Sequence, residues 1–154
     1  MQILTAQLTD LAGIQRLYAT LFSEMAELAP KAYQPARQSL EFLLSILQRE
    51  DCDILVALQE DGTLLGFALL QQLQTPPYAC LVAHRYAYLM DLIVRKEFRK
   101  KGVGRALLSA AKQWAKDCRL DYLELNVLAQ NPSARALYLQ EGFEDAAVIM
   151  RCPL

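Results

Sequence analysis

The chain has 154 residues, of which 54% are hydrophobic, and its formal net charge is −1. This length suits one domain with a sizeable core over residues 1–154, and the hydrophobic content excludes a disordered chain. A nucleic-acid partner is not expected without a strong basic excess, and no apolar run is long enough to span a membrane. The N-terminus lacks the regions of a signal peptide, so we expect a cytoplasmic protein with free thiols, and the cysteine spacing fits no metal site.

The first half of the chain predicts helices and strands around one core. Leu11, Ile14, Leu17 and Tyr18 recur at helical spacing, which indicates a helix with one buried face. Asp61-Gly62 is typical of a hairpin turn between two strands. The expected elements are a strand at 2–8, a helix after residue 10, a helix opened by Pro35, and strands at 53–59 and 64–73.

The second half predicts the elements that carry the chemistry. A single acid, Asp91, interrupts an apolar strand, and strand alternation places it on the opposite face from Met90. Asn131 and Pro132 mark the start of the last helix, and Gly142 marks its end. The expected elements are a strand at 86–94, a helix at 104–118, a strand at 121–128, a helix after Asn131, and a last strand at 146–151.

The turn between the strand at 86–94 and the next helix predicts an anion site. Two glycines one residue apart allow positive φ and close approach to the backbone. The first N–H groups of the helix lack intrahelical partners and lie at the positive end of its dipole, where phosphate binds readily. Four cations add positive charge around this turn. They are Arg99, Lys100, Lys101 and Arg105.

Two common nucleotide-binding patterns do not match this turn. A P-loop needs four residues between its glycines and then Lys-Ser/Thr, whereas Arg105 follows here. A dinucleotide fingerprint needs a third glycine where Leu107 stands. Arg99-Lys100-Lys101-Gly102-Val103-Gly104 does match R/Q-x-x-G-x-G/A, and a second block follows, N-x-x-A-x-x-L-Y-x-x-x-G-F from Asn131 to Phe143. Together these blocks resemble the GCN5-related N-acetyltransferase (GNAT) superfamily over about residues 86–150.

The resemblance implies an α/β (α+β) fold in the order β-α-α-β-β-β-α-β-α-β. Its central sheet is mixed and mostly antiparallel, with a splayed central strand pair and about four flanking helices. It also implies acetyl-CoA as cosubstrate, no metal, an amine acceptor as the other partner, and it allows a homodimer. The expected cofactor-binding residues are Leu92, Ile93, Val94, Arg99, Lys100, Lys101, Gly102, Val103, Gly104, Arg105, Asn131, Ser133 and Tyr138.

The implied reaction is direct transfer of an acetyl group to a primary amine of a small molecule or protein. Tyr138 would protonate the leaving thiolate, and Asp91 would serve as the base, directly or through a water. Met90 stands where many relatives have a glutamate, which leaves room for an alternative, a non-catalytic acyl-CoA-binding sensor or partner module. Glu24 and Glu27, at the end of the first helix, either attract the amine or are solvated acids.

Overall fold

Five strands form one sheet in the order β1-β2-β3-β4-β5 in the computed structural model, which describes residues 1–154. The first four strands pair antiparallel, and β4 and β5 pair parallel. This confirms the mixed, mostly antiparallel sheet. The strands are β1 Gln2–Thr5, β2 Cys52–Leu58, β3 Leu64–Gln74, β4 Arg85–Val94 and β5 Leu123–Leu125, and the helices are α1 Leu11–Leu28, α2 Leu40–Leu47, α3 Val103–Asp117 and α4 Pro132–Gln140.

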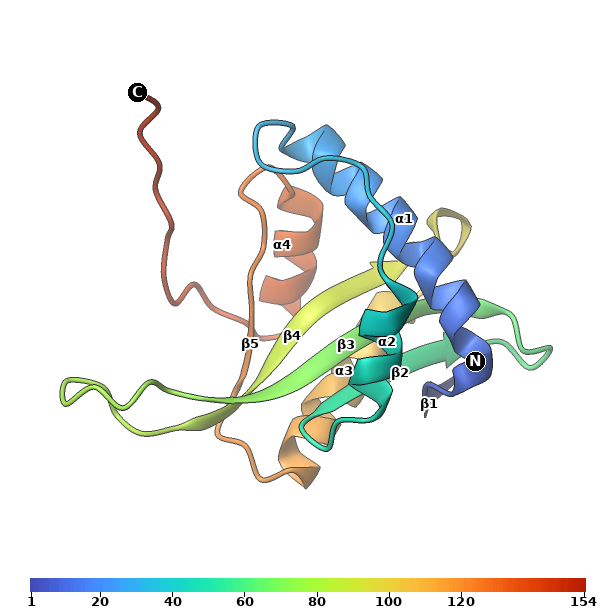
Figure 1. The fold of residues 1–154 in the computed structure, drawn as a ribbon, viewed down its shortest axis with the longest axis horizontal. Helices are drawn as coiled ribbons and strands as arrows, with labels where there is room; N and C mark the ends of the chain where they lie inside the picture. The colour runs from blue at the N-terminus through green and yellow to red at the C-terminus, as the bar shows by residue number, and fades with distance from the viewer.

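Helices cover both faces of the sheet, and each face has its own hydrophobic cluster. Figure 1 shows α1 and α2 on one face and α3 on the other. The α1–α2 cluster contains the fully buried Ile14, Tyr18 and Phe67, and the α3 cluster contains the fully buried Leu107 and Leu108. The sheet is therefore dry on both sides, which agrees with the apolar runs of its central strands.

A bulge in β4 changes which way its side chains point. Leu69 pairs with Asp91 and Leu70 pairs with Leu89, so Met90 is an extra residue on β4. Met90 packs against the α1–α2 cluster, and Asp91 bonds to Tyr18 of the same cluster. The expectation that Met90 and Asp91 lie on opposite faces is therefore wrong, because simple alternation fails at a bulge.

The parallel pair β4–β5 is short and opens toward the end of β4. Only Ala87, Tyr88 and Leu89 of β4 have partners on β5, so residues 90–94 have no neighbour on that side. This confirms the splayed central strand pair. On the other side of β4, a side chain at Gly66 would place its Cβ 2.4 Å from the Ile93 carbonyl oxygen, so this glycine permits close packing of β3.

Three expected elements differ from the structure. Residues 146–151 form no strand but an extended, exposed segment, so the predicted last strand is wrong: its apolar residues have no strand beside them. The second helix begins at Leu40, not near Pro35, because the Ser39 side chain caps it by accepting from the Phe42 N–H. The strand expected at 121–128 is limited to Leu123–Leu125, where pairing with β4 ends. No helix combines the length and apolar character needed to cross a membrane.

Candidate functional site

The loop between β4 and α3 has a backbone shape suited to anions. Lys100 has φ 59° and Gly102 has φ 85°, so two left-handed residues alternate with ordinary ones just before α3. Such an alternation turns successive N–H groups toward one point, which makes an anion-binding concavity. A left-handed lysine is unusual and costs conformational energy, and such conformations cluster at functional sites.

The N–H groups of this loop are available to a ligand. The backbone N–H groups of residues 101–105 donate to no carbonyl or side chain of the protein, and the first bond of the helix comes from the Ala106 N–H to the Gly102 carbonyl. Five donors at the start of a helix therefore face outward at the positive end of the dipole. The structure brings residues Lys101–Arg105 together as the sequence predicts, in a form that fits a phosphate or diphosphate.

The basic side chains around the loop have different partners. Lys100 and Lys101 are exposed and carry free charge beside the N–H groups. Arg105 donates to Glu141 at the end of α4 at 2.6 Å, and Lys112 lies 3.4 Å from the same carboxylate. The Arg105 hydrogen bond holds the pKa of Glu141 below its usual value. These contacts tie the first half of α3 to the end of α4.

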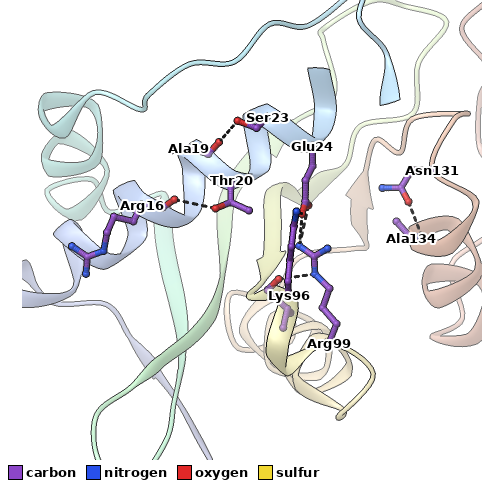
Figure 2. Close-up of polar contacts among 10 residues, drawn as sticks. Arg16, Ala19, Thr20, Ser23, Glu24, Lys96, Arg99, Asn131 and Ala134 are labelled. Carbon is purple, nitrogen blue, oxygen red and sulfur yellow. Dashed lines mark hydrogen bonds and ion pairs between the residues drawn. The ribbon is translucent and has the colours of Figure 1, made fainter. Parts of the chain in front are cut away.

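Arg99 is bound to α1 rather than turned to the loop. Its Nε donates to the Val94 carbonyl at 2.8 Å, and its Nη2 lies 2.9 Å from both oxygens of Glu24. Lys96 adds a longer contact of 3.5 Å to the same acid. Figure 2 shows Glu24 reaching from α1 to both cations. Glu24 is therefore an ion-paired residue that joins α1 to the phosphate loop, neither a free acid for an amine nor a solvated one.

Asp91 is held at one oxygen and open at the other. The hydroxyl of Tyr18, a fully buried residue, donates to Asp91 Oδ2 at 2.7 Å. Asp91 Oδ1 has no partner in the protein, and since no buried side-chain oxygen lacks a partner, this atom reaches the surface. Burial raises the pKa of Asp91, and the Tyr18 hydrogen bond opposes that rise. A carboxylate with a raised pKa, one anchored oxygen and one free oxygen has the properties of a general base.

Tyr138 offers a free hydroxyl from α4. Its ring packs edge-on against Phe143 at 5.7 Å, and it belongs to the cluster that covers the α3 face. Its hydroxyl bonds to no protein atom and is not sealed in the core. Burial, and then the charge of Asp91, raise the pKa of Tyr138 to about 12. The phenol therefore stays protonated at neutral pH and can act as an acid.

The remaining predicted residues line the opening between β4 and α4. Leu92 and Ile93 lie on the part of β4 that has no neighbour on the β5 side, whereas the Val94 carbonyl already accepts from Arg99. Asn131 caps α4 by accepting from the Ala134 N–H at 3.1 Å, and its amide nitrogen points away from that helix (Figure 2). Ser133 is exposed in the first turn of α4.

Sequence reasoning did not identify Tyr18 or Glu24 as parts of this site in their observed roles. Tyr18 was predicted only as a member of the buried face of α1, and the available signal was a hydroxyl on an otherwise apolar stripe. A buried tyrosine hydroxyl usually has a polar partner, and here the partner is Asp91. Glu24 carried no such signal, because its partner Arg99 is 75 residues away in the chain.

Comparisons with known proteins agree with this geometry. The model of the acetyltransferase (GNAT) family matches residues 14–143. The chain is 34% identical over 145 residues to the uncharacterized N-acetyltransferase YhfO of Bacillus subtilis, covering 94% of this chain and 91% of that protein. It is 32% identical over 138 residues to an aminoglycoside N(6')-acetyltransferase type 1 of Klebsiella aerogenes, covering 87% of each.

Solved structures show the same fold. A mutant form of the BH1408 protein of Bacillus halodurans superposes with a TM-score of 0.94 at 24% identity, over 100% of this chain and 99% of that one. The aminoglycoside N-acetyltransferase AAC(6')-Iy, solved in complex with CoA, superposes with a TM-score of 0.74 at 18% identity, over 99% of this chain and 100% of that one. With the family match over most of its length, the chain belongs to the GNAT acetyltransferase family.

Proposed function

We propose that this protein transfers an acetyl group from acetyl-CoA to a primary amine of a small molecule or protein. The observation that carries the proposal is the row of unpaired N–H groups at residues 101–105, which lies next to α4 and its free Tyr138 hydroxyl. The two parts touch, since a Cβ at Gly104 would lie 3.4 Å from Leu137, the neighbour of Tyr138. A phosphate site and an acid in one place are the parts that acyl transfer from CoA requires.

The residues present fit acetyl-CoA. The N–H groups of residues 101–105, with Lys100 and Lys101 beside them, would hold the diphosphate. The open edge of β4 at Leu92 and Ile93 would pair with the pantetheine arm as an added strand does. Support also comes from the relative AAC(6')-Iy, which was solved with CoA. Further expected contacts come from Val94, Arg99, Asn131, Ser133 and Tyr138.

Acetyl-CoA, when bound, supplies an activated thioester and a thiolate leaving group. Asp91 Oδ1 would accept a proton from the ammonium of the acceptor, directly or through a water, because only the neutral amine has a lone pair. Its raised pKa suits this task near neutral pH. The Tyr138 hydroxyl would then donate its proton to the sulfur as the C–S bond breaks. No covalent bond to the enzyme forms.

The alternative is a module that binds acyl-CoA without transferring the acyl group. Met90 supports this alternative, because it packs into the α1–α2 cluster where many relatives carry an acid. The alternative keeps the phosphate site and gives no role to Asp91 Oδ1. The two functions therefore differ in turnover and not in cofactor binding.

Calorimetric titration of acetyl-CoA into the protein, followed by measurement of released CoA thiol, tests the proposal. The acceptors should include aminoglycosides, polyamines, amino acids and peptide N-termini, since two relatives bear the name aminoglycoside N(6')-acetyltransferase. Binding followed by thiol release with one acceptor class supports the enzyme. Binding without release from any class favours the sensor, and absence of binding contradicts both.

A further inference from the structure

The C-terminal segment, residues 144–154, is an apolar strand without a partner. Val148, Ile149 and Met150 are 80%, 78% and 88% exposed, well above the other hydrophobic residues of the second half of the chain, apart from Leu154 at the end. Residues 144–154 neither donate nor accept a backbone hydrogen bond. The run from Ala146 to Met150 is apolar at every position, which is typical of a strand covered on both faces. Such a segment is expected to find a sheet edge and an apolar cover.

The sheet offers a complementary edge at β5. This strand is the last in the order β1-β2-β3-β4-β5, so its outer backbone groups pair with nothing. Its three residues are all only partly buried, including Leu123 and Leu125, which pack on the α3 cluster. An unpaired edge beside incompletely covered leucines is a template for an added strand.

The root of the segment is fixed so that it leads away from the β5 of its own chain. The Phe143 N–H donates to the Tyr138 carbonyl at 3.0 Å, and the Phe143 ring packs against Tyr138. Asp145 then pairs with Arg135 on α4 at 2.5 Å. Figure 1 shows the segment, in red, running away from the sheet, with the C-terminus far from every strand. Pairing with its own β5 would require these contacts to break.

We propose that residues 146–151 add as a strand to the β5 edge of a second copy of this chain, and that the second copy returns the same contact. The segment leaves the molecule beside its own β5, because Phe143 packs in the same cluster as Leu123 and Leu125. When two copies approach with their β5 edges facing, each segment reaches the β5 of the other. The contact is self-complementary and closes as a two-fold dimer.

A second copy fits better than other occupants. The segment supplies a free strand and the same chain supplies a free edge, so one contact made twice satisfies both. Arg151 is the only charged residue from Ala146 onward, so the segment lacks the cluster of cations that attracts an anionic membrane surface. The other free edge, β1, lies at the opposite side of the sheet from the root of the segment. Pairing there would give an open chain of molecules and not a closed dimer.

Sedimentation equilibrium of the full chain tests the proposal. We expect twice the chain mass of 17.4 kDa at micromolar concentration. The variant Ile149→Asp, which buries a charge in the new contact, should raise the dimer dissociation constant about 100-fold or more. A chain that ends at Asp145, which keeps the pair with Arg135, should be a monomer.

The matched control is Leu8→Asp, which makes the same type of change at a leucine that is 68% exposed and lies outside the segment. It should leave the dimer unchanged. Because Ile149 touches nothing in the monomer core, Ile149→Asp should also keep the helical circular dichroism spectrum of the parent. This separates loss of assembly from loss of folding.

Three results would overturn the proposal. The full chain could sediment as a monomer with fast hydrogen exchange in residues 146–151, which means that the segment has no partner. It could be a monomer with slow exchange there, which means that the segment pairs with its own β5. A dimer that persists in the chain ending at Asp145 would place the interface elsewhere. None of these outcomes depends on acetyl transfer, so the proposed enzyme stands or falls separately.

Discussion

The two parts of the candidate site are built from different materials. The phosphate loop uses backbone N–H groups of residues 101–105, whereas proton transfer depends on the side chains of Asp91, Tyr138 and Tyr18. A backbone site survives most side-chain changes as long as the positive φ at Lys100 and Gly102 is kept. A side-chain centre fails when a single oxygen is removed. Substitutions should therefore affect binding in the first part and turnover in the second.

Tyr138→Phe should have the largest effect. Loss of the acid is expected to lower kcat by about 10²–10⁴-fold, while the dissociation constant of acetyl-CoA stays within about twofold. The hydroxyl bonds to no protein atom, so its removal should leave the melting temperature unchanged or slightly higher. Steady-state kinetics and calorimetry measure the two quantities. Unchanged kcat in this variant would show that Tyr138 is not the acid.

Gly104→Glu should have the next largest effect, and on binding. A carboxylate beside the diphosphate places like charges together, which costs several kcal/mol, so the acetyl-CoA dissociation constant should rise about 100-fold or more. Calorimetric titration gives this value directly.

The control for this variant is Gly104→Ala. The added Cβ would lie 3.4 Å from Leu137 and 3.8 Å from Val94, which is tight but tolerable packing, and φ at this glycine is not positive. We expect the alanine variant to bind acetyl-CoA with near-parental affinity. If the folded glutamate variant also binds normally, the loop is not the diphosphate site.

Tyr18→Phe should sharpen the comparison through pH. The Tyr18 hydrogen bond lowers the pKa of Asp91, so its removal raises that pKa further. The base form then requires higher pH, and the acidic limb of kcat/KM should move to higher pH. Loss of a hydrogen bond to a charged group should also lower the free energy of unfolding by about 1.5–3 kcal/mol.

The variant Asp91→Asn separates the base from its anchor. It should remove the acidic limb of the pH profile together with most turnover. The folded pKa of Asp91 is raised, so its ionisation destabilises the native state as pH rises through that pKa. The asparagine variant should therefore gain more stability, relative to the parent, at pH 8 than below the usual aspartate pKa of about 4. A pH-independent difference in thermal melts would contradict this account.

Glu24→Gln should have the smallest effect, a two- to fivefold gain in acetyl-CoA affinity. The Arg99 guanidinium directs its Nη2 to Glu24, and loss of that carboxylate frees its charge for the diphosphate, with an effect of about 1 kcal/mol or less for a partly exposed pair. Arg99→Ala in the same background should cancel the gain. Equal or weaker binding in Glu24→Gln would show that Arg99 only joins α1 to the loop.

Most of the fold and the phosphate loop follow from local sequence. Asn131 and Pro132 start α4 as expected, and Asn131 makes the predicted cap. The turn at residues 99–105 is equally local, because two glycines and the following helix determine its N–H groups. Local signals of this kind need no knowledge of the rest of the molecule.

The features that sequence reasoning missed depend on distant contacts. The bulge at Met90 arises from the register of β3 against β4, and it alone places Asp91 beside Tyr18. The Arg99–Glu24 pair joins residues 75 positions apart. The segment at 146–151 has the composition of a strand, but a strand needs a neighbour, and the single chain supplies none.

The way α4 is attached has a consequence for the conditions under which the protein works. This helix contains no fully buried residue, and its end is tied by Glu141 to Arg105 and Lys112. Contacts between partly exposed charges weaken as ionic strength rises, whereas the packing of α3 does not. The proposed acid, Tyr138, therefore lies on the most salt-sensitive helix. Potassium chloride in the assay buffer should loosen the catalytic geometry well before it unfolds the protein.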